Sequence, residues 1–160
     1  MSESTGRIPH VDWERVDEAA LNLPESAEWL GYWRDLTAEH GAPPPRAALN
    51  LIGDHPKLAP LALWAERLPD GDFLFRLVGE LVRHYAGVSL KNKKLSEIDL
   101  NGSEGFIARK YAAAVETGAP VCSRGRYNFG DREVAREAVV MPFAEADGGV
   151  RHLLIGMAFK

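Results

Sequence analysis

The sequence has little of what several classes of protein require. Its 160 residues include one cysteine, Cys122, which excludes an intrachain disulfide and a zinc site built from cysteines, because each needs further cysteines. The formal net charge of −4 gives no overall basic excess for binding nucleic acid. No apolar run approaches the ~18 residues of a membrane span, and the acidic, polar start does not resemble a signal peptide. These absences favour a soluble cytoplasmic protein.

Catalytic and metal-binding signatures are also missing. The sequence contains no GxSxG nucleophile elbow, no Walker phosphate loop and no GxGxxG fingerprint. Its five histidines show neither HxH nor HExxH spacing, so the pattern gives no support for a metal site. We therefore expect a protein that is not an enzyme and has no catalytic residues.

What remains is the composition of an ordinary globular domain. The hydrophobic fraction is 46% and the charged fraction 26%, which are typical of soluble globules, and the length suits one domain with its own core. We expect a partly flexible extension over 1–24 and a single domain over 25–160, with a helical cap at about 25–53.

The N-terminal part reads as helical. Asp12 is a possible cap for a short helix, and a longer one starts near Pro24, covers SAEWLGYWRDLTAEHG and ends at Gly41. A further helical piece is expected over 46–52. The apolar stripe of the longer helix is predicted to comprise Leu30, Trp33, Thr37 and His40, flanked by Trp29 and Leu36.

The remainder alternates like strands, with helices between. FLFRLVG has strand periodicity. Short helices follow, and then a longer helix starts at Asn101-Gly102-Ser103-Glu104 and stops at Gly118. Three strands complete the chain, VCSRGRYNF, VAREAVVMPFAE and VRHLLIGMAF, the last two joined as a hairpin by Ala146-Asp147-Gly148-Gly149.

The last two strands are apolar on both faces, so the sheet must be covered on both. One face should meet the short helices and the helix carrying Phe106, Ile107 and Tyr111, which could enclose a ligand cavity. The other needs the N-terminal helix with Trp29 and Trp33, or a second subunit. The plain alternative is that all these side chains simply form the core.

The order and spacing of these segments resemble a PAS domain, specifically the compact bacterial single-domain subfamily with an N-terminal helical extension. The resemblance rests on LAPLALWAE, DFLFRLVGELVRHYAGVSLKNKKLSEI and CSRGRYNFGDREVAREAVVMPFAEADGGVRHLLIGMAF. It implies an α+β fold, with a five-stranded antiparallel sheet and short helices on one face. One departure is Asn92, where glycine is expected, although Asn tolerates a left-handed backbone.

The resemblance also implies a function and allows cofactors to be tested. It implies a sensory or interaction module of bacterial signal transduction that signals in trans, because no output domain follows Lys160. Haem-binding relatives need a histidine on the long helix, which has none, and His84 is the only nearby substitute. Flavin-binding relatives need a cysteine in the short helix before it, whereas Cys122 lies on the following strand. Haem and flavin are thus disfavoured, the cofactor stays unknown, and the protein is expected to be colourless.

Pocket candidates follow from the expected cavity. Arg126 is the first candidate for an anion. The charged stretch of Asp131, Glu133 and Glu137 with Arg132 and Arg136 is interpreted as a solvated, charge-paired strand entry. The full set of ligand-pocket candidates is Phe75, Phe106, Ile107, Tyr111, Ala114, Arg126, Tyr127, Met141 and Met157.

The N-terminal helix suggests a homodimer. One sheet face can absorb only one stripe of it, so at least one large aromatic among Trp29, Tyr32 and Trp33, with Leu36 beside them, should stay exposed and pair with a second copy. A signalling protein partner and a small ligand are also expected, without nucleic acid or membrane insertion. The alternatives are an enzyme or carrier on the same cavity, and a ligand-free structural adaptor.

Overall fold

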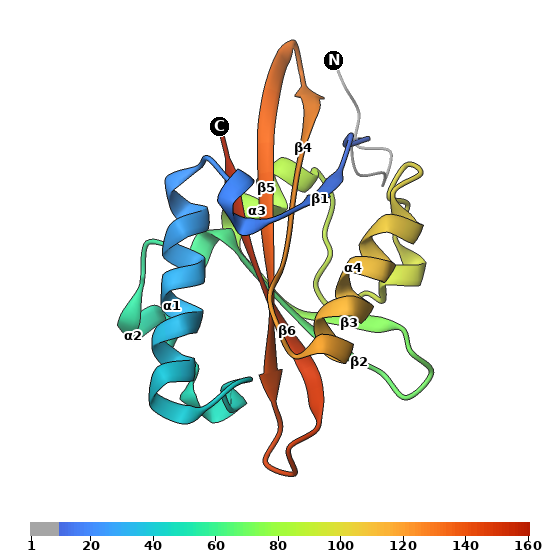
Figure 1. Cartoon of the computed structure of the whole chain (residues 1–160). Coiled ribbons are helices and arrows are strands. Elements are labelled where there is room, and N and C mark those ends of the chain that lie inside the picture. Colours follow the sequence, from blue (N-terminus) through green and yellow to red (C-terminus); the bar gives the residue numbers. More distant parts are fainter. Residues whose placement is uncertain (1–9) are drawn as a thin grey trace.

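A central antiparallel sheet with helices on both faces organises the chain (Figure 1). The computed structural model describes residues 10–160. Residues 1–9, part of the extension expected to be partly flexible, lie outside the described residues. The PAS-like α+β fold predicted from the sequence is confirmed, with six strands in place of five.

The elements agree closely with the predicted order. The strands are β1 (Glu14–Val16), β2 (Ala62–Arg67), β3 (Phe73–Val78), β4 (Val121–Phe129), β5 (Arg132–Ala144) and β6 (Val150–Phe159). The α-helices are α1 (Pro24–His40), α2 (Leu51–Asp54), α3 (Glu80–Ala86) and α4 (Glu104–Thr117). Short 3-10 helices are η1 (Glu18–Ala20), η2 (Arg46–Ala48), η3 (Ala59–Leu61) and η4 (Leu95–Glu97).

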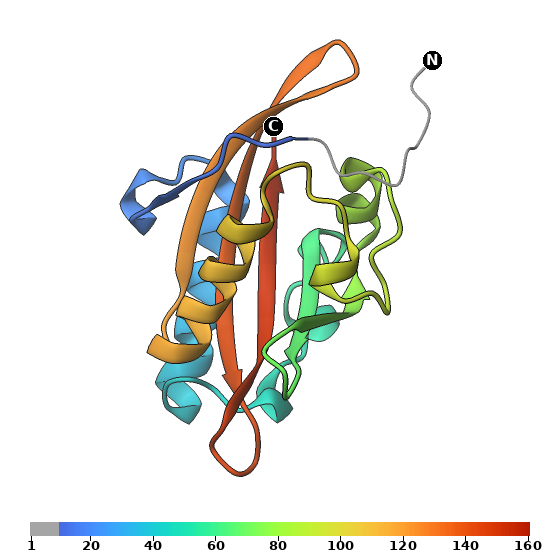
Figure 2. The ribbon, with the colours of Figure 1, turned by 90° about the vertical axis from the view of Figure 1, so that its right-hand side faces the viewer.

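The strand order across the sheet is β1-β4-β5-β6-β2-β3, with every neighbouring pair antiparallel. The C-terminal strand β6 therefore lies between β5 and β2, in the middle of the sheet. Between β3 and β4 the chain leaves the sheet to form α3, η4 and α4 on one face (Figure 2).

The sixth strand replaces a helix expected after Asp12, and that prediction is wrong. Residues Glu14–Val16 pair with β4, and the Asp12 N–H donates to the Arg126 carbonyl at 3.2 Å. The extended backbone puts alternate residues on the same side, and Val11 and Trp13 both turn toward the interior. Helical spacing would have separated these two side chains.

Helix α1 forms as predicted, with a different buried stripe. Proline occupies its first turn and Gly41, with φ +94°, ends it. The predicted stripe is wrong at His40, which is exposed, because the chain turns away at Gly41. The buried positions of the helix are Ser26, Trp29, Leu30, Tyr32, Trp33 and Leu36.

Two turn predictions have clear outcomes. Asn92 has φ +64°, so the asparagine does adopt the left-handed backbone expected at that position. The piece predicted over 46–52 is broken into η2 and α2, where the Asn50 side chain accepts a hydrogen bond from the Gly53 N–H. That cap starts a new helix, so one continuous segment cannot form.

Each sheet face carries its own apolar core. Leu153, Ile155 and Met157 of β6 pack under α3, η4 and α4. Leu154 and Met141 pack with α1 on the opposite face. Figure 2 shows α4 and α1 on opposite sides of the sheet. Coverage on both faces is thus confirmed, and α1 of the same chain covers the second face. None of the described helices is long and apolar enough to span a bilayer.

Candidate functional site

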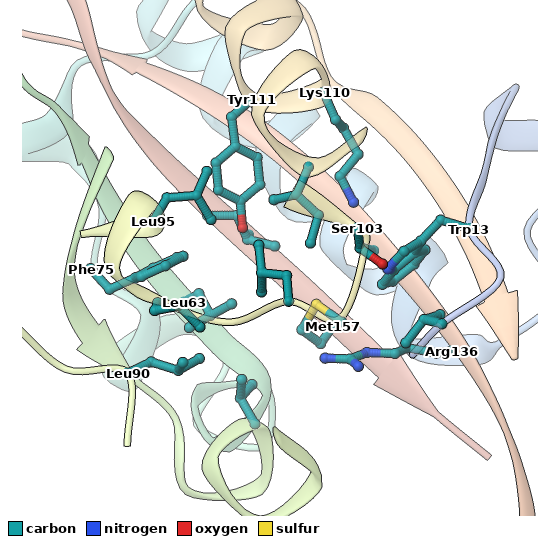
Figure 3. A pocket seen from close by; sticks show the side chains of 17 residues that line it. Trp13, Leu63, Phe75, Leu90, Leu95, Ser103, Lys110, Tyr111, Arg136 and Met157 are labelled. Carbon is teal, nitrogen blue, oxygen red and sulfur yellow. The ribbon is translucent and has the colours of Figure 1, made fainter. Parts of the chain in front are cut away.

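A cavity of about 50 Å³ lies between the sheet and the helices that follow β3 (Figure 3). Most of its wall is apolar, because β2, β3 and β6 each present alternate apolar residues to this face. The principal apolar side chains are Leu63, Phe75, Leu90, Leu95, Ile155 and Met157.

Lys110 marks the polar end of the cavity. It projects from α4, its side chain is only 4% exposed, and its ammonium donates to the Ser123 hydroxyl at 2.8 Å. The ammonium also lies 4.4 Å from the centre of the Trp13 ring and 5.4 Å from that of Phe106. Burial, together with the nearby positive charge of Arg136, lowers the pKa of Lys110 to about 7.

Arg136 is the second buried cation. It projects from β5 and is 7% exposed. Its guanidinium lies 5.2 to 5.4 Å from the ring centres of Trp13, Tyr127 and Phe159, and its Nε is enclosed without a hydrogen-bond partner in the described part of the chain. Burial lowers the pKa of the guanidinium, which nevertheless stays charged at neutral pH because its ordinary pKa is so high.

Two hydroxyl groups also line the cavity. The Tyr111 hydroxyl points into the cavity (Figure 3), while the ring packs edge-on against Phe73 and Phe75. Burial raises the pKa of Tyr111 well above its usual value, so its hydroxyl stays protonated. Ser103 directly precedes α4, and its side chain makes no capping hydrogen bond, which leaves this hydroxyl at the cavity wall.

The N-terminal segment separates the cavity from an outer groove. Val11, Trp13, Ser103 and Arg136 line both the cavity and an open groove of about 1010 Å³. The segment approaches β4 closely because Gly125 has no side chain: a Cβ there would lie 2.6 Å from Val11 Cγ1. A change inside the cavity can therefore reach the surface through Trp13.

The structure brings some of the predicted pocket residues together and separates others. Phe75, Ile107, Tyr111 and Met157 line the cavity, and their role in binding stays a prediction. The cavity wall does not include Phe106, Ala114, Arg126, Tyr127 or Met141.

Each of these five has a different position. Met141 faces α1, because alternation along β5 sends it opposite to Ala138. Arg126 is exposed and pairs with Glu133 at 2.7 Å. Phe106 stacks on Trp13.

The other two are buried but do not line the cavity. Tyr127 packs with Val11 and Val134. Ala114 is fully buried in the same core as the cavity wall, so a larger side chain there is expected to cost stability before it affects binding.

Burial overturns the reasoning for dimerisation through α1. The dimer candidates Trp29, Tyr32, Trp33 and Leu36 are all buried in their own chain, so the expectation of an exposed aromatic is wrong. Trp29 lies against Gly156, where a Cβ would come within 2.3 Å of the indole. Tyr32 is covered by the segment after α1, and its hydroxyl donates to Asp54 at 3.0 Å.

Arg136 and Lys110 are the site residues that sequence reasoning missed. Reading Arg136 and Glu137 as solvated was wrong, since both are buried. The signal was in the pattern: Arg136 is in phase with the buried Ala138 and Val140 along the strand, and Lys110 is in helical phase with Ala114. Because both residues are charged, they were not considered for the interior, although their spacing placed them on buried faces.

The cofactor candidates lie away from the cavity. His84 is exposed on α3, and Cys122 is buried on the α1 side of the sheet. Within residues 10–160, no group of three or more His, Cys, Asp or Glu side chains is arranged to hold a metal ion.

No protein-family model matches the sequence, and no curated protein is similar to it. Solved structures with a similar backbone include a sensory box sensor histidine kinase from Vibrio cholerae, at 15% identity and a TM-score of 0.47, over 84% of this chain and 97% of that one. The PAS domain of Bordetella pertussis BvgS is 16% identical, with a TM-score of 0.40, over 61% and 74%. An RNA-binding Light-Oxygen-Voltage receptor is 14% identical, with a TM-score of 0.47, over 94% and 39%.

Proposed function

We propose that this protein is a sensory module of signal transduction, which binds a small molecule in the cavity beside Lys110 and Arg136 and signals to a partner protein. The observation that carries the proposal is the combination of an apolar cavity with buried polar groups at one end. Ligand sites are mostly apolar and carry a few converging polar groups. The PAS-like order of strands and helices supports the sensory class.

The competing idea of a ligand-free adaptor accounts poorly for the two cations. A core that only has to be filled is more stable with apolar side chains than with buried charges. Lys110 and Arg136 both lie at a cavity wall, where a bound molecule can reach them. Their burial is therefore better explained by binding than by packing.

The cavity also limits the size of the ligand. A volume of about 50 Å³ is far below the roughly 300–1,000 Å³ of typical drug-sized ligand sites. At ~10–15 Å³ per water, it corresponds to roughly four water molecules. We therefore expect a ligand of few non-hydrogen atoms.

Transmission to a partner is proposed to run through the N-terminal segment. Trp13 touches the cavity, and the adjoining strand β1 is only three residues long at the edge of the sheet. A short edge strand is easily displaced, because few hydrogen bonds hold it. Ligand binding is expected to change the protection of this strand, and hydrogen exchange of the β1 amides measures that change.

Native mass spectrometry tests the binding function. The variant Ala138→Leu fills the cavity, and Ala112→Leu makes the same change on α4 outside the cavity and both cores. A small bound molecule on the wild-type protein and on Ala112→Leu, but absent from Ala138→Leu, is the expected result. Ligand-free wild-type protein that also fails to respond to a small-molecule library in thermal shift would support the adaptor instead.

A second candidate, an enzyme or carrier, has one observation in its favour. With its pKa lowered to about 7, Lys110 presents an appreciable fraction of neutral amine, which can attack a carbonyl compound. The same mass spectra separate the two ideas. An adduct on Lys110 that survives denaturation would favour covalent chemistry, whereas a mass lost on denaturation favours the sensory module.

A further inference from the structure

We infer that the ligand of this cavity is a small monocarboxylate with a short apolar chain, whose carboxylate binds Lys110 and Arg136. This inference rests on the ligand-binding function proposed above. It is carried by a charge imbalance in the interior: two cations are buried at one place, and no acid among residues 10–160 balances them there.

The described acids near this end are engaged elsewhere. Glu137 follows Arg136 directly but faces α1, where its carboxylate accepts hydrogen bonds from the N–H groups of Asn22 and Leu23 and from the Ser26 hydroxyl, at 2.6 to 3.0 Å. Glu133 pairs with the exposed Arg126. In the described part of the chain, neither Lys110 nor Arg136 forms an ion pair.

The groups that remain are mostly donors. An ammonium offers three N–H donors and a guanidinium five, yet the described residues give Lys110 one hydrogen bond, to Ser123, and leave Arg136 Nε without any. The Tyr111 and Ser103 hydroxyls add two more donors at the same wall. A carboxylate is an acceptor-only group with two oxygens, and it complements such a set.

Trp13 is a common neighbour of the two cations. Both lie over the same Trp13 ring, with the Lys110 ammonium 4.4 Å and the Arg136 guanidinium 5.4 Å from its centre. Figure 3 shows Lys110 coming from α4 and Arg136 from the sheet toward the end of the cavity where Trp13 lies. Because both cations lie beside Trp13 at this end of the cavity, we expect one small anion to reach both.

The apolar wall and the volume of the cavity favour an anion with one charged group and a short apolar chain. Leu63 and Leu95 line the part away from the cations (Figure 3), and inorganic phosphate or sulfate has no apolar part to place there. A second carboxylate would be buried against these side chains without a partner, which is costly. The volume of about 50 Å³ then limits the chain to a few carbons.

The test is isothermal titration calorimetry at pH 7 with acetate, propionate, butyrate and hexanoate, each compared with its amide. The amides have nearly the same shape and no charge, so the comparison needs only the wild-type protein. We expect the acids to bind, with an optimum among the shorter chains, and each amide to bind at least about 30-fold more weakly.

Variants locate the binding site. Arg136→Met and Lys110→Met should each weaken carboxylate binding at least about 30-fold, whereas Arg126→Met, at the exposed arginine, should leave it unchanged. If Arg136→Met does not fold, Lys110→Met and the comparison of acids with amides still decide the matter.

The possible failures can be told apart. The carboxylate assignment is wrong if amides bind as tightly as acids, or if both cation variants bind acids as tightly as the wild-type protein does. Either result would still leave ligand binding by the cavity in place. The assignment also falls if no acid binds. In that case the native mass spectra decide. A bound molecule seen on the wild-type protein and absent from Ala138→Leu still supports the proposed ligand-binding function, whereas a wild-type protein without any bound molecule contradicts it.

Discussion

Arg136 and Glu137 are neighbours on β5 and both are buried, but they face opposite sides of the sheet and meet opposite conditions. The Glu137 carboxylate accepts three hydrogen bonds at the start of α1. Arg136 has its Nε enclosed without a partner in the described chain. A satisfied buried charge serves the fold, whereas an unsatisfied one needs a different explanation.

The two layers of the molecule differ in the same way. On the α1 side, the indole N–H groups of Trp29 and Trp33 donate to the Met157 and Pro142 carbonyls at 3.1 and 3.0 Å, and large side chains fill the space. On the α4 side there is a cavity with buried donors. The α1 layer is therefore expected to supply stability and the α4 layer to supply binding.

The largest expected effect is at Trp29, in the filled layer. Trp29→Ala should lower the free energy of unfolding by about 3–5 kcal/mol, because it leaves a large cavity and frees the Met157 carbonyl. Urea denaturation measures this loss. Leu81→Ala, at an exposed apolar residue, is the control and should change stability by less than about 0.5 kcal/mol. A loss below about 1 kcal/mol at Trp29 would contradict the assignment of stability to the α1 layer.

Removing the satisfied charge should come next in size. Glu137→Ala leaves two N–H groups and the Ser26 hydroxyl without their acceptor, and we expect a loss of about 3 kcal/mol in urea denaturation. Glu133→Ala removes an exposed carboxylate with one arginine partner and should cost less than about 1 kcal/mol. Equal losses in the two variants would mean that burial of Glu137 adds nothing.

Removing the unsatisfied charge should act in the opposite direction. Arg136→Met replaces a buried cation by an apolar side chain of similar length, so the ligand-free protein should gain about 1–2 kcal/mol in free energy of unfolding. The comparison is made by urea denaturation after dialysis that removes bound small molecules. A loss of stability would show that Arg136 is a structural element, like Glu137.

The last expected effect is a change of stability with pH, which is gradual. The folded-state pKa of Lys110, about 7, is below the value of 10.5 for an unperturbed lysine, so the unfolded chain binds more protons between these values. Desolvation causes the shift, with Arg136 adding to it and the Cys122 thiol opposing it. The cost of burying the charged Lys110 ammonium therefore lowers the free energy of unfolding in full below pH 7. This cost decreases as the pH rises toward 10.5.

Stability of the wild-type protein relative to Lys110→Met should therefore increase from pH 7 to pH 9, by at most about 1.4 kcal/mol per pH unit. Urea denaturation at pH 7, 8 and 9 gives this difference. Lys91→Met, at an exposed position, is the control, and its free energy of unfolding should change with pH as that of the wild-type protein does. A flat difference for Lys110→Met would mean that the buried amine keeps an ordinary pKa.

Local sequence signals predicted most of the elements. The alternation of VCSRGRYNF and VRHLLIGMAF matches β4 and β6 to the residue, and Gly41 and Gly118 end α1 and α4 at left-handed or unusual backbone angles. Two-sided apolar strands predicted a sheet covered on both faces. Such features depend on neighbours along the chain, so one sequence suffices to recognise them.

The site was predicted less well, because its residues come together only in space. Phe75, Ile107, Tyr111 and Met157 were identified from apolar periodicity, and they do line the cavity. Arg126 was the anion candidate, whereas Arg136 was interpreted as solvated because charged residues are ordinarily exposed, and Met141 was assigned to the wrong face of the sheet. Alternation along β5 already grouped Arg136 with Ala138 and opposite to Met141, but only the tertiary structure decides which of these faces meets α4 and which meets α1.

By itself, the sequence determined the strands, the helices and the need to cover both sheet faces, since periodicity and glycine turns act over a few residues. Only the tertiary structure decided that α1 buries all its aromatics within its own chain, that Glu14–Val16 forms an edge strand, and that Lys110 and Arg136 lie over one indole ring. These outcomes depend on close approach between segments far apart in the chain, such as Gly125 against Val11 and Gly156 against Trp29. Packing decides which of two adjacent charged residues finds a partner.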